Sequence, residues 1–237
     1  MQGKLYLIPA PLSDSDLNFS IPENVKIVAG KLKYFVVEDL RTARRYLSRL
    51  KVEIPISEIH FSLLNEHTGV ASIDALLAPI LQGNDMGLLS DAGLPCIADP
   101  GEELVRIAHS KGIKVVPLTG PSSIFMALAA SGLSGERFSF EGYLPVKTVE
   151  LSKRLKKLEQ WSRLERQSII FIETPYRSAK MLETILNVCS RDTLLCVACN
   201  ITADDEFVKT ATVAEWKKNI PSLNKKPCIF IIQALLV

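Results

Sequence analysis

The chain has 237 residues, of which 47% are hydrophobic and 23% charged, and its formal net charge at pH 7 is +2. This composition is ordinary for a globular protein, and the length allows one large or two modest domains. Its apolar runs are far shorter than the roughly 18 residues that span a membrane, and its N-terminus lacks a signal-peptide pattern, so we expect no membrane partner. Any nucleic-acid binding must depend on a local basic patch, because the net charge is so small.

Strand and helix patterns alternate through the first half of the chain. Short apolar runs predict strands at 4–11, 33–39, 85–91 and 113–120. Apolar residues at helical spacing predict a helix over 40–50 and another over 73–81, although Pro79 is awkward inside the second. A third helix should start near Asp99 as its N-cap, with Pro100 in the first turn.

In the second half the strand patterns follow one another with fewer helices between them. They lie at 168–175, 193–201, 206–213 and 227–237. We therefore predict a two-domain α/β protein, with a mostly parallel sheet in residues 1–117 and a mixed sheet in residues 118–237.

Loops rich in glycine and proline follow the strands at 9–16, 90–101 and 117–124. Open α/β sheets bind ligands at the carboxyl ends of their strands, so these loops predict a ligand site, although each alone could be a simple turn. The glycine-rich dinucleotide and triphosphate motifs are missing. Small, neutral side chains with one acid, Asp91, suit an adenosine-bearing cation better than a polyphosphate.

Several motifs resemble the tetrapyrrole-methylase-like (class III) methyltransferases, and most closely the ribosomal RNA small subunit methyltransferase I family. They are "LYLIPAPL", "VEDLRTARRYL", "NEH", "LLSDAGLPCIADPG", "PLTGPSS", "RFSFEGYLP" and "FIETPYRSAKML". The resemblance covers nearly the whole chain, and the central motif is long.

This resemblance implies a homodimeric two-domain enzyme that holds S-adenosylmethionine (SAM) between its domains, without a metal, and methylates a ribose 2′-hydroxyl of cytidine in small-subunit rRNA. Carried over by motif, the cofactor-binding residues would be Pro9, Ala10, Pro11, Leu12, Ser90, Asp91, Ala92, Gly93, Pro95, Thr119, Gly120, Pro121, Ser122, Phe171, Ile172, Cys199, Asn200, Ile201, Pro227 and Cys228.

The catalytic groups stay open. A ribose hydroxyl is a weak nucleophile and benefits from a base. The candidate carboxylates are Glu38, Asp39, Glu66, Asp91 and Asp99. Arg41 could contact a phosphate or orient a carboxylate. Asp39 and Glu66 could instead be solvated or helix-capping groups, and His67 could touch the substrate.

The chain also departs from the family pattern. Leu94 replaces a threonine, the first loop lacks the family's glycine and asparagine, and several charged positions are lost at Cys199, Asn200, Ala203 and Pro227. A paralogue with another acceptor, such as a small molecule or a tetrapyrrole, or a non-catalytic SAM- or RNA-binding module, therefore remains an alternative.

Two further features admit competing interpretations. Segment 146–168 is rich in lysine and arginine and could bind RNA, or it could be an amphipathic helix with Leu151, Leu155 and Leu158 inward. The five cysteines lie at apolar positions with no framework spacing, which indicates a reducing, cytoplasmic environment. Cys196 and Cys199 should point to opposite faces of a strand, which argues against a metal or redox pair.

Overall fold

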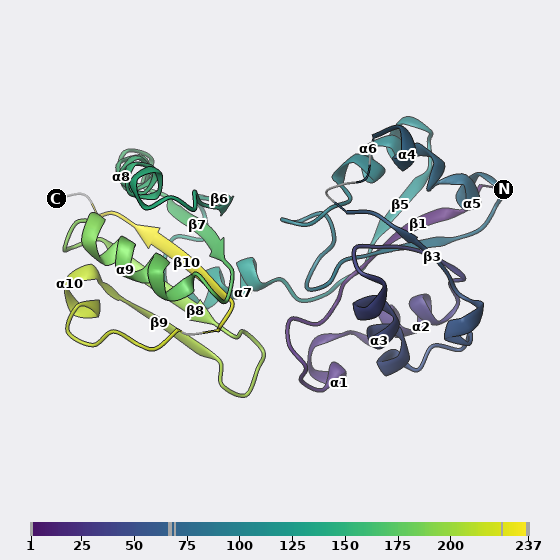
Figure 1. Ribbon diagram of the computed structural model, residues 1–237, viewed down its shortest axis with the longest axis horizontal. Helices are drawn as coiled ribbons and strands as arrows, with labels where there is room; N and C mark the ends of the chain where they lie inside the picture. Colours follow the sequence, from purple (N-terminus) through teal and green to yellow (C-terminus); the bar gives the residue numbers. More distant parts are fainter. Residues whose placement is uncertain (1, 66–67, 69, 224, 236–237) are drawn as a thin grey trace. The chain divides into compact units, whose positions relative to one another are not determined.

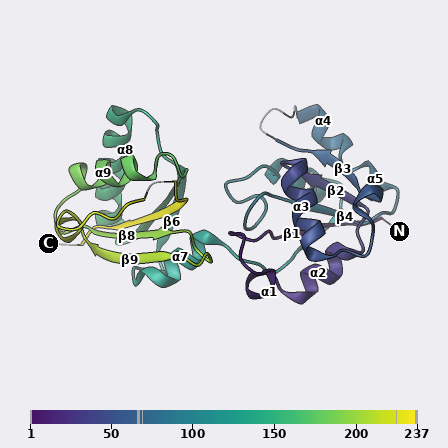
Figure 2. The ribbon, with the colours of Figure 1, turned by 60° about the horizontal axis from the view of Figure 1, so that its bottom comes forward.

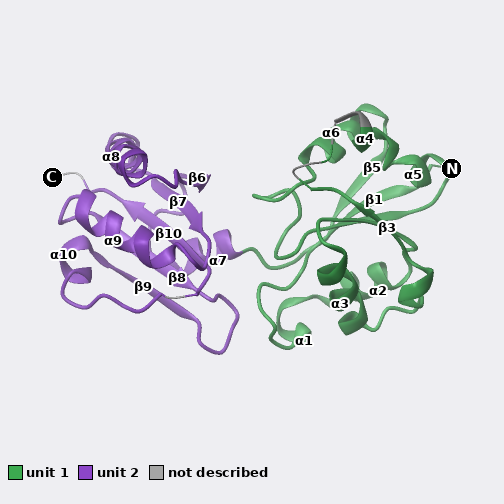
Figure 3. Cartoon of the chain, in the orientation of Figure 1, with its two compact units in different colours: residues 1–122 green, residues 123–237 purple. Residues whose placement is uncertain are grey.

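A computed structural model describes residues 2–65, 68, 70–223 and 225–235. The chain divides into two compact units, residues 1–122 and 123–237 (Figure 3). Each unit has its own sheet and its own hydrophobic core, and each is described by itself. No helix among the described residues is both long enough and apolar enough to cross a membrane.

The first unit is built on a five-stranded parallel sheet with the strand order β3-β2-β4-β1-β5 (Figure 1). The strands are β1 (Lys4–Ile8), β2 (Tyr34–Val37), β3 (His60–Leu63), β4 (Met86–Leu89) and β5 (Lys114–Pro117). The four predicted strands of this sheet are confirmed, whereas the edge strand β3 was not predicted. Because the strands are parallel, all their carboxyl ends lie at one edge.

Helices cover both faces of this sheet. Strand side chains alternate between the faces, and apolar side chains on each face are buried against the helices. One face packs against α1 (Leu17–Ser20), α2 (Glu23–Gly30) and α3 (Leu40–Leu50). The other packs against α4 (Val70–Ala75), α5 (Ala78–Leu81) and α6 (Glu102–Ser110). A short 3-10 turn, η1 (Ile56–Glu58), precedes β3.

Two helix predictions were wrong in detail. The helix expected over 73–81 is two helices, α4 and α5, because Pro79 fits only the first turn of a new helix. Helix α6 starts after Gly101, whose φ of 135° makes it the residue that precedes the helix. Asp99 therefore does not cap α6, and Pro100 lies before its first turn.

The second unit contains a mixed sheet with the order β6-β7-β10-β8-β9, in which only the β6–β7 pair is parallel. Its strands are β6 (Phe138–Tyr143), β7 (Ser168–Glu173), β8 (Leu194–Cys199), β9 (Phe207–Thr212) and β10 (Cys228–Gln233). The predicted α/β fold, parallel in the first sheet and mixed in the second, is confirmed, but β6 was missed.

Helices lie on both faces of this second sheet (Figure 2). One face carries α8 (Thr148–Glu165), α9 (Ser178–Val188) and α10 (Val213–Trp216), and the other carries α7 (Ser123–Ser131). Leu151, Leu155 and Leu158 of α8 point inward, as the amphipathic interpretation of this segment predicts. Arg154 of the same helix forms an ion pair with Glu141 of β6.

The cysteines differ from the expectation of unpaired thiols. Cys199 of β8 and Cys228 of β10 face each other in the sheet and form a disulfide, with their Cα atoms 4.3 Å apart. Cys96, Cys189 and Cys196 are free thiols. The pair could not be seen in the sequence because it depends on the register of two strands that are 29 residues apart.

Candidate active site

The loops after β1, β4 and β5 meet at the carboxyl edge of the parallel sheet. Ala10 and Gly93 exchange two backbone hydrogen bonds, of 2.8 and 3.0 Å, which join the first two loops. Gly93 has a φ of +72°, a conformation that favours glycine. The third loop reaches this junction through Gly120, which lies directly against the ring of Pro9. The predicted gathering of these loops at one edge is thus what the structure shows.

Three carboxyl groups crowd beside this junction: Glu38 after β2, Asp91 after β4, and Asp99 in the loop before α6. The pairing of Val37 with Leu89 brings the first two together. Burial, followed by repulsion from Asp99 and Asp91, raises the pKa of Glu38 to about 7, although a backbone hydrogen bond from Asp91 acts in the opposite direction. The cluster therefore contains a carboxyl group that titrates near neutral pH.

The pKa values of the other two acids, Asp99 and Asp91, are raised as well. Burial and the charge of Asp91 raise the pKa of Asp99 to about 6, and burial followed by repulsion from Asp39 raises the pKa of Asp91. Among the residues that the structure describes, no group of three His, Cys, Asp or Glu side chains is arranged to hold a metal ion. Burial and repulsion between the carboxylates raise the pKa values of this cluster.

Asp39, a candidate base, is the N-cap of α3. Its carboxylate accepts hydrogen bonds from the backbone N–H and the hydroxyl of Thr42, at 2.8 and 3.0 Å. These bonds lower the pKa of Asp39. A carboxylate that is both stabilised and occupied in this way is a poor proton acceptor. The neighbouring candidate Arg41 is exposed on the first turn of the same helix.

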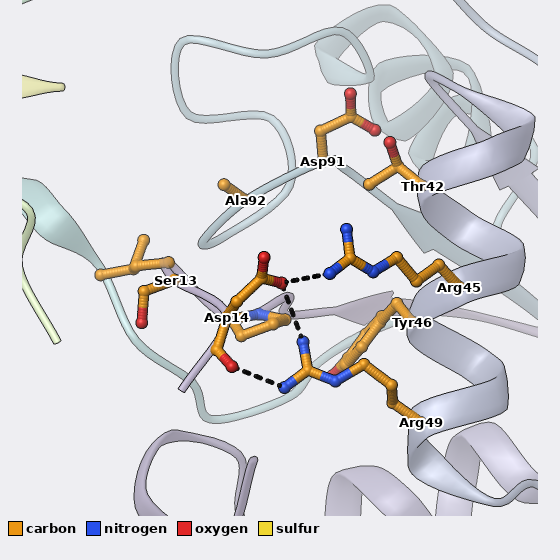
Figure 4. Close-up of a pocket in the computed structure, with 10 residues that line it drawn as sticks. Ser13, Asp14, Thr42, Arg45, Tyr46, Arg49, Asp91 and Ala92 are labelled. Atoms are coloured by element: carbon orange, nitrogen blue, oxygen red, sulfur yellow. Dashed lines mark hydrogen bonds and ion pairs between the residues drawn. The ribbon is translucent and has the colours of Figure 1, made fainter. Parts of the chain in front are cut away.

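A pocket of about 260 Å³ opens between the β1 loop and α3 (Figure 4). Arg45 and Arg49 point from α3 toward Asp14 of the loop. Tyr46, which lies between them in sequence, is buried, and its hydroxyl donates a 2.8 Å hydrogen bond to the carbonyl of Pro9. The remaining lining residues are Pro11, Leu12, Ser13, Thr42, Asp91 and Ala92.

The Tyr46 hydrogen bond should stabilise the loop junction measurably. Replacing Tyr46 with phenylalanine removes the bond to Pro9 and should lower the free energy of unfolding by about 1 kcal/mol. Urea denaturation measures this change. Tyr176→Phe is the matched control, because Tyr176 is 87% exposed and the same deletion there should leave the midpoint unchanged. Equal midpoints for Tyr46→Phe and the native protein would contradict the prediction.

Most cofactor residues expected in the first unit lie at this edge. Pro11, Leu12, Asp91 and Ala92 line the pocket. Ser90, Gly93, Pro95 and Pro121 are buried and support the loops, while Thr119 is exposed. The loop junction thus consists of the residues that the motifs singled out.

In the second unit the expected residues gather near one end of the central strands. Asn200 donates a backbone hydrogen bond to Pro227, at 3.2 Å, beside the Cys199–Cys228 pair. Ile201 is buried there, and Ile172 pairs with Ile229 of β10. The side chain of Phe171, however, is buried in the core and stacks on Phe230, so only its backbone remains for a contact with adenine. Cys199 and Cys228 likewise face that core.

Two candidates, Glu66 and His67, lie outside the described residues. Sequence reasoning missed Asp14, Arg45, Tyr46 and Arg49 as parts of a site. A signal was present for the arginines, because residues four apart lie on one face of a helix. Nothing in the sequence showed that the β1 loop turns back over that face.

Comparisons with known proteins agree with this geometry. The profile of the family "Tetrapyrrole (Corrin/Porphyrin) Methylases" matches residues 23–217. Ribosomal RNA small subunit methyltransferase I of Escherichia coli O157:H7 is 31% identical over 98% of this chain and 78% of its own length. The proteins of that name from Xylella fastidiosa and Buchnera aphidicola are each 32% identical, over 90% and 97% of this chain and 73% and 78% of their own lengths.

A solved structure has the same fold. The methyltransferase CobJ superposes with a TM-score of 0.65 over 98% of this chain and 94% of its own, at 13% identity. At that identity the likeness concerns the fold alone. The family profile and the relatives carry the assignment, and they agree with the motifs at the three loops: the chain belongs to the tetrapyrrole methylase family and groups with the ribosomal RNA small subunit methyltransferases I.

Proposed function

We propose that this protein transfers a methyl group from SAM to a ribose 2′-hydroxyl of a cytidine in small-subunit rRNA. The names of its relatives support the substrate, and the family supports the reaction. We further propose that it acts in the cytoplasm as a homodimer. The observation that carries the proposal is the junction of the three motif loops, joined by the Ala10–Gly93 hydrogen bonds, with the carboxyl group of Glu38 beside it.

The residues at the junction fit the cofactor. Pro11, Leu12 and Ala92 present small or apolar surfaces, which would suit an adenosine group, while Asp91 offers a negative charge that would suit a sulfonium. When bound, SAM supplies the methyl group and its own leaving group, a neutral thioether. The protein's main task is therefore to align the acceptor oxygen.

Glu38 is the group best suited to accept the proton of the acceptor hydroxyl. A base works best when its pKa lies near the operating pH, and that of Glu38 is about 7. Its carboxylate would take the hydroxyl proton, and the acceptor oxygen would receive the methyl group that SAM supplies. Burial keeps the pKa of Glu38 high, and the charges of Asp99 and Asp91 raise it further because they disfavour its ionised form.

A different acceptor is the second candidate. The position that the family pattern gives to arginine is Cys199, which here is buried and paired with Cys228. A buried disulfide cannot contact a phosphate, so the second unit has lost one cationic contact that the resemblance implies. If RNA is the substrate, positively charged residues elsewhere must supply the contact with its phosphates.

The proposal predicts label in RNA when the purified protein is incubated with methyl-labelled SAM and small ribosomal subunits that lack ribose methylation. Nuclease digestion should place the label in a 2′-O-methylcytidine. Label found only in a small-molecule extract would show a different acceptor. Absence of label from both, with SAM bound, would identify a binding module and contradict the proposed reaction.

A further inference from the structure

The pocket beside Tyr46 brings two guanidinium groups to one carboxylate, that of Asp14, while Asp91 lines another part of it. Arg45 and Arg49 contact the same carboxylate oxygen of Asp14, at 3.0 and 3.3 Å. Arg49 also donates hydrogen bonds to the carbonyls of Asp14 and Ser15, at 3.3 and 2.7 Å. One carboxylate therefore faces two guanidinium groups (Figure 4).

Asp14 is a weakly held partner. Its side chain is 74% exposed and that of Arg45 is 66% exposed. Ion pairs between exposed groups contribute little stability, because water solvates both charges well. A stronger anion could displace the carboxylate without a large loss of folding energy, and a phosphate accepts hydrogen bonds from two guanidinium groups at once.

The positive charge continues beyond this pocket. A second cavity, of about 420 Å³, adjoins it and shares Arg49 as a wall. Lys51 adds a further cation there, whereas Lys26 is already paired with Glu23, at 3.0 Å. The acid in that cavity, Asp16, is occupied as the N-cap of α1, where it accepts the backbone N–H of Asn18 at 3.0 Å. Two adjoining cavities with cations in both suit successive phosphates of a chain better than one isolated anion.

We propose that the arginine side of the first cavity, at Arg45 and Arg49, and the second cavity bind consecutive phosphodiester groups of the RNA strand next to the acceptor nucleotide. The first phosphate displaces Asp14 from Arg45, and the loop side of the first cavity is left to the cofactor. This inference rests on the proposed function and names the groups that hold its substrate. The first cavity ends at Thr42 and Asp91, beside the carboxyl cluster. A phosphate at Arg45 would therefore hold the strand against the edge where Glu38 lies.

Arg45→Gln tests the proposal, with Arg44→Gln as the matched control on the same helix. Arg44 is exposed, lies over the ring of Phe61 and does not line either cavity. Filter binding of a small-subunit rRNA transcript over a salt series should show about tenfold weaker binding for Arg45→Gln. The slope of log affinity against log salt should fall by about 0.7, the value for one phosphate contact on a single strand. Arg44→Gln should change neither quantity by as much.

Asp14→Asn should act in the opposite direction. The amide keeps the shape of the loop but removes the charge that competes with phosphate, so RNA binding should become several-fold tighter. Weaker RNA binding by Asp14→Asn, with an unchanged melting temperature, would overturn the displacement step. Titration of each variant with SAM tests the alternative that these arginines bind the carboxylate of the cofactor and not an RNA phosphate.

Equal RNA affinities for Arg45→Gln and Arg44→Gln would overturn the inference, as would loss of SAM affinity in Arg45→Gln without any change in RNA affinity. Both results can occur while the native protein still methylates RNA, and then only this inference fails. A native protein that binds SAM but neither binds nor methylates the transcript or small subunits would overturn the proposed substrate and this inference together.

Discussion

Replacing Glu38 with glutamine should slow methyl transfer to RNA by about 10²- to 10⁴-fold, the usual contribution of a general base. Glutamine keeps the size and the hydrogen-bond acceptor of the side chain but cannot take a proton. Affinity for SAM, measured by calorimetric titration, should stay unchanged because the substitution removes only a group that acts on the acceptor. Full activity of Glu38→Gln would exclude Glu38 as the base.

The pH dependence gives a second measurement of the same role. A base must be ionised, and the pKa of Glu38 is about 7. The rate at limiting substrate should therefore rise with pH and level off above about 7. Asp99→Asn removes a charge that raises this pKa, so its profile should shift to lower pH while the base remains. A profile that is unmoved in Asp99→Asn would contradict the electrostatic origin of the shift.

The stability of the folded protein should fall as the pH rises, whereas the rate of methyl transfer should rise. The folded-state pKa of Glu38 lies above its ordinary value of 4.5, so the folded protein binds this proton more tightly than the unfolded chain. The stability that comes from protonated Glu38 is fully present below about pH 4.5 and is lost as the pH rises through about 7. Glu38→Gln should therefore be more resistant to urea than the native protein at pH 8, but not at pH 4.

The sequence predicted the edge of the first sheet better than the side chains that meet there. Strand ends and loop glycines can be predicted locally, because an apolar run or a glycine such as Gly93 can be recognised within a few positions of the sequence. The acid cluster is not local. Asp99 resembles a helix cap in the D-P-G triplet, and only the path of the loop, with Gly101 at φ 135°, brings it beside Glu38 instead.

In the second unit, strand pairing decides where the side chains of the predicted site residues point. Side chains alternate across a strand, so motif matching that places Phe171 near a ligand does not say which face its ring takes. The register with β10 turns Phe171 into the core against Phe230 and leaves Ile172 on the other face. The same register pairs Cys199 with Cys228. The missed strands β3 and β6 each lie at an edge of their sheet and carry polar residues, which weakens their pattern.

If the loop junction is the cofactor site, Gly120→Ala should weaken SAM binding by at least about tenfold. It should also lower the free energy of unfolding by about 1–3 kcal/mol, a typical cost of overpacking. A Cβ at this position would lie 2.1 Å from the Cβ and 2.3 Å from the Cγ of Pro9. The proline ring is stiff, and Pro9 is held by the hydroxyl of Tyr46, so the strain must pass to the loops instead.

Two other glycines separate this clash from the general cost of replacing glycine. Gly135→Ala meets no atom within 4 Å and should change neither SAM affinity nor stability. Gly112→Ala also meets open space, but its φ of +68° should make it less stable without affecting SAM binding. Calorimetric titration and urea denaturation of the three variants measure both quantities. A Gly120→Ala protein that is destabilised yet binds SAM like the native chain would show that the junction of Pro9, Gly93 and Gly120 serves the fold and not the cofactor.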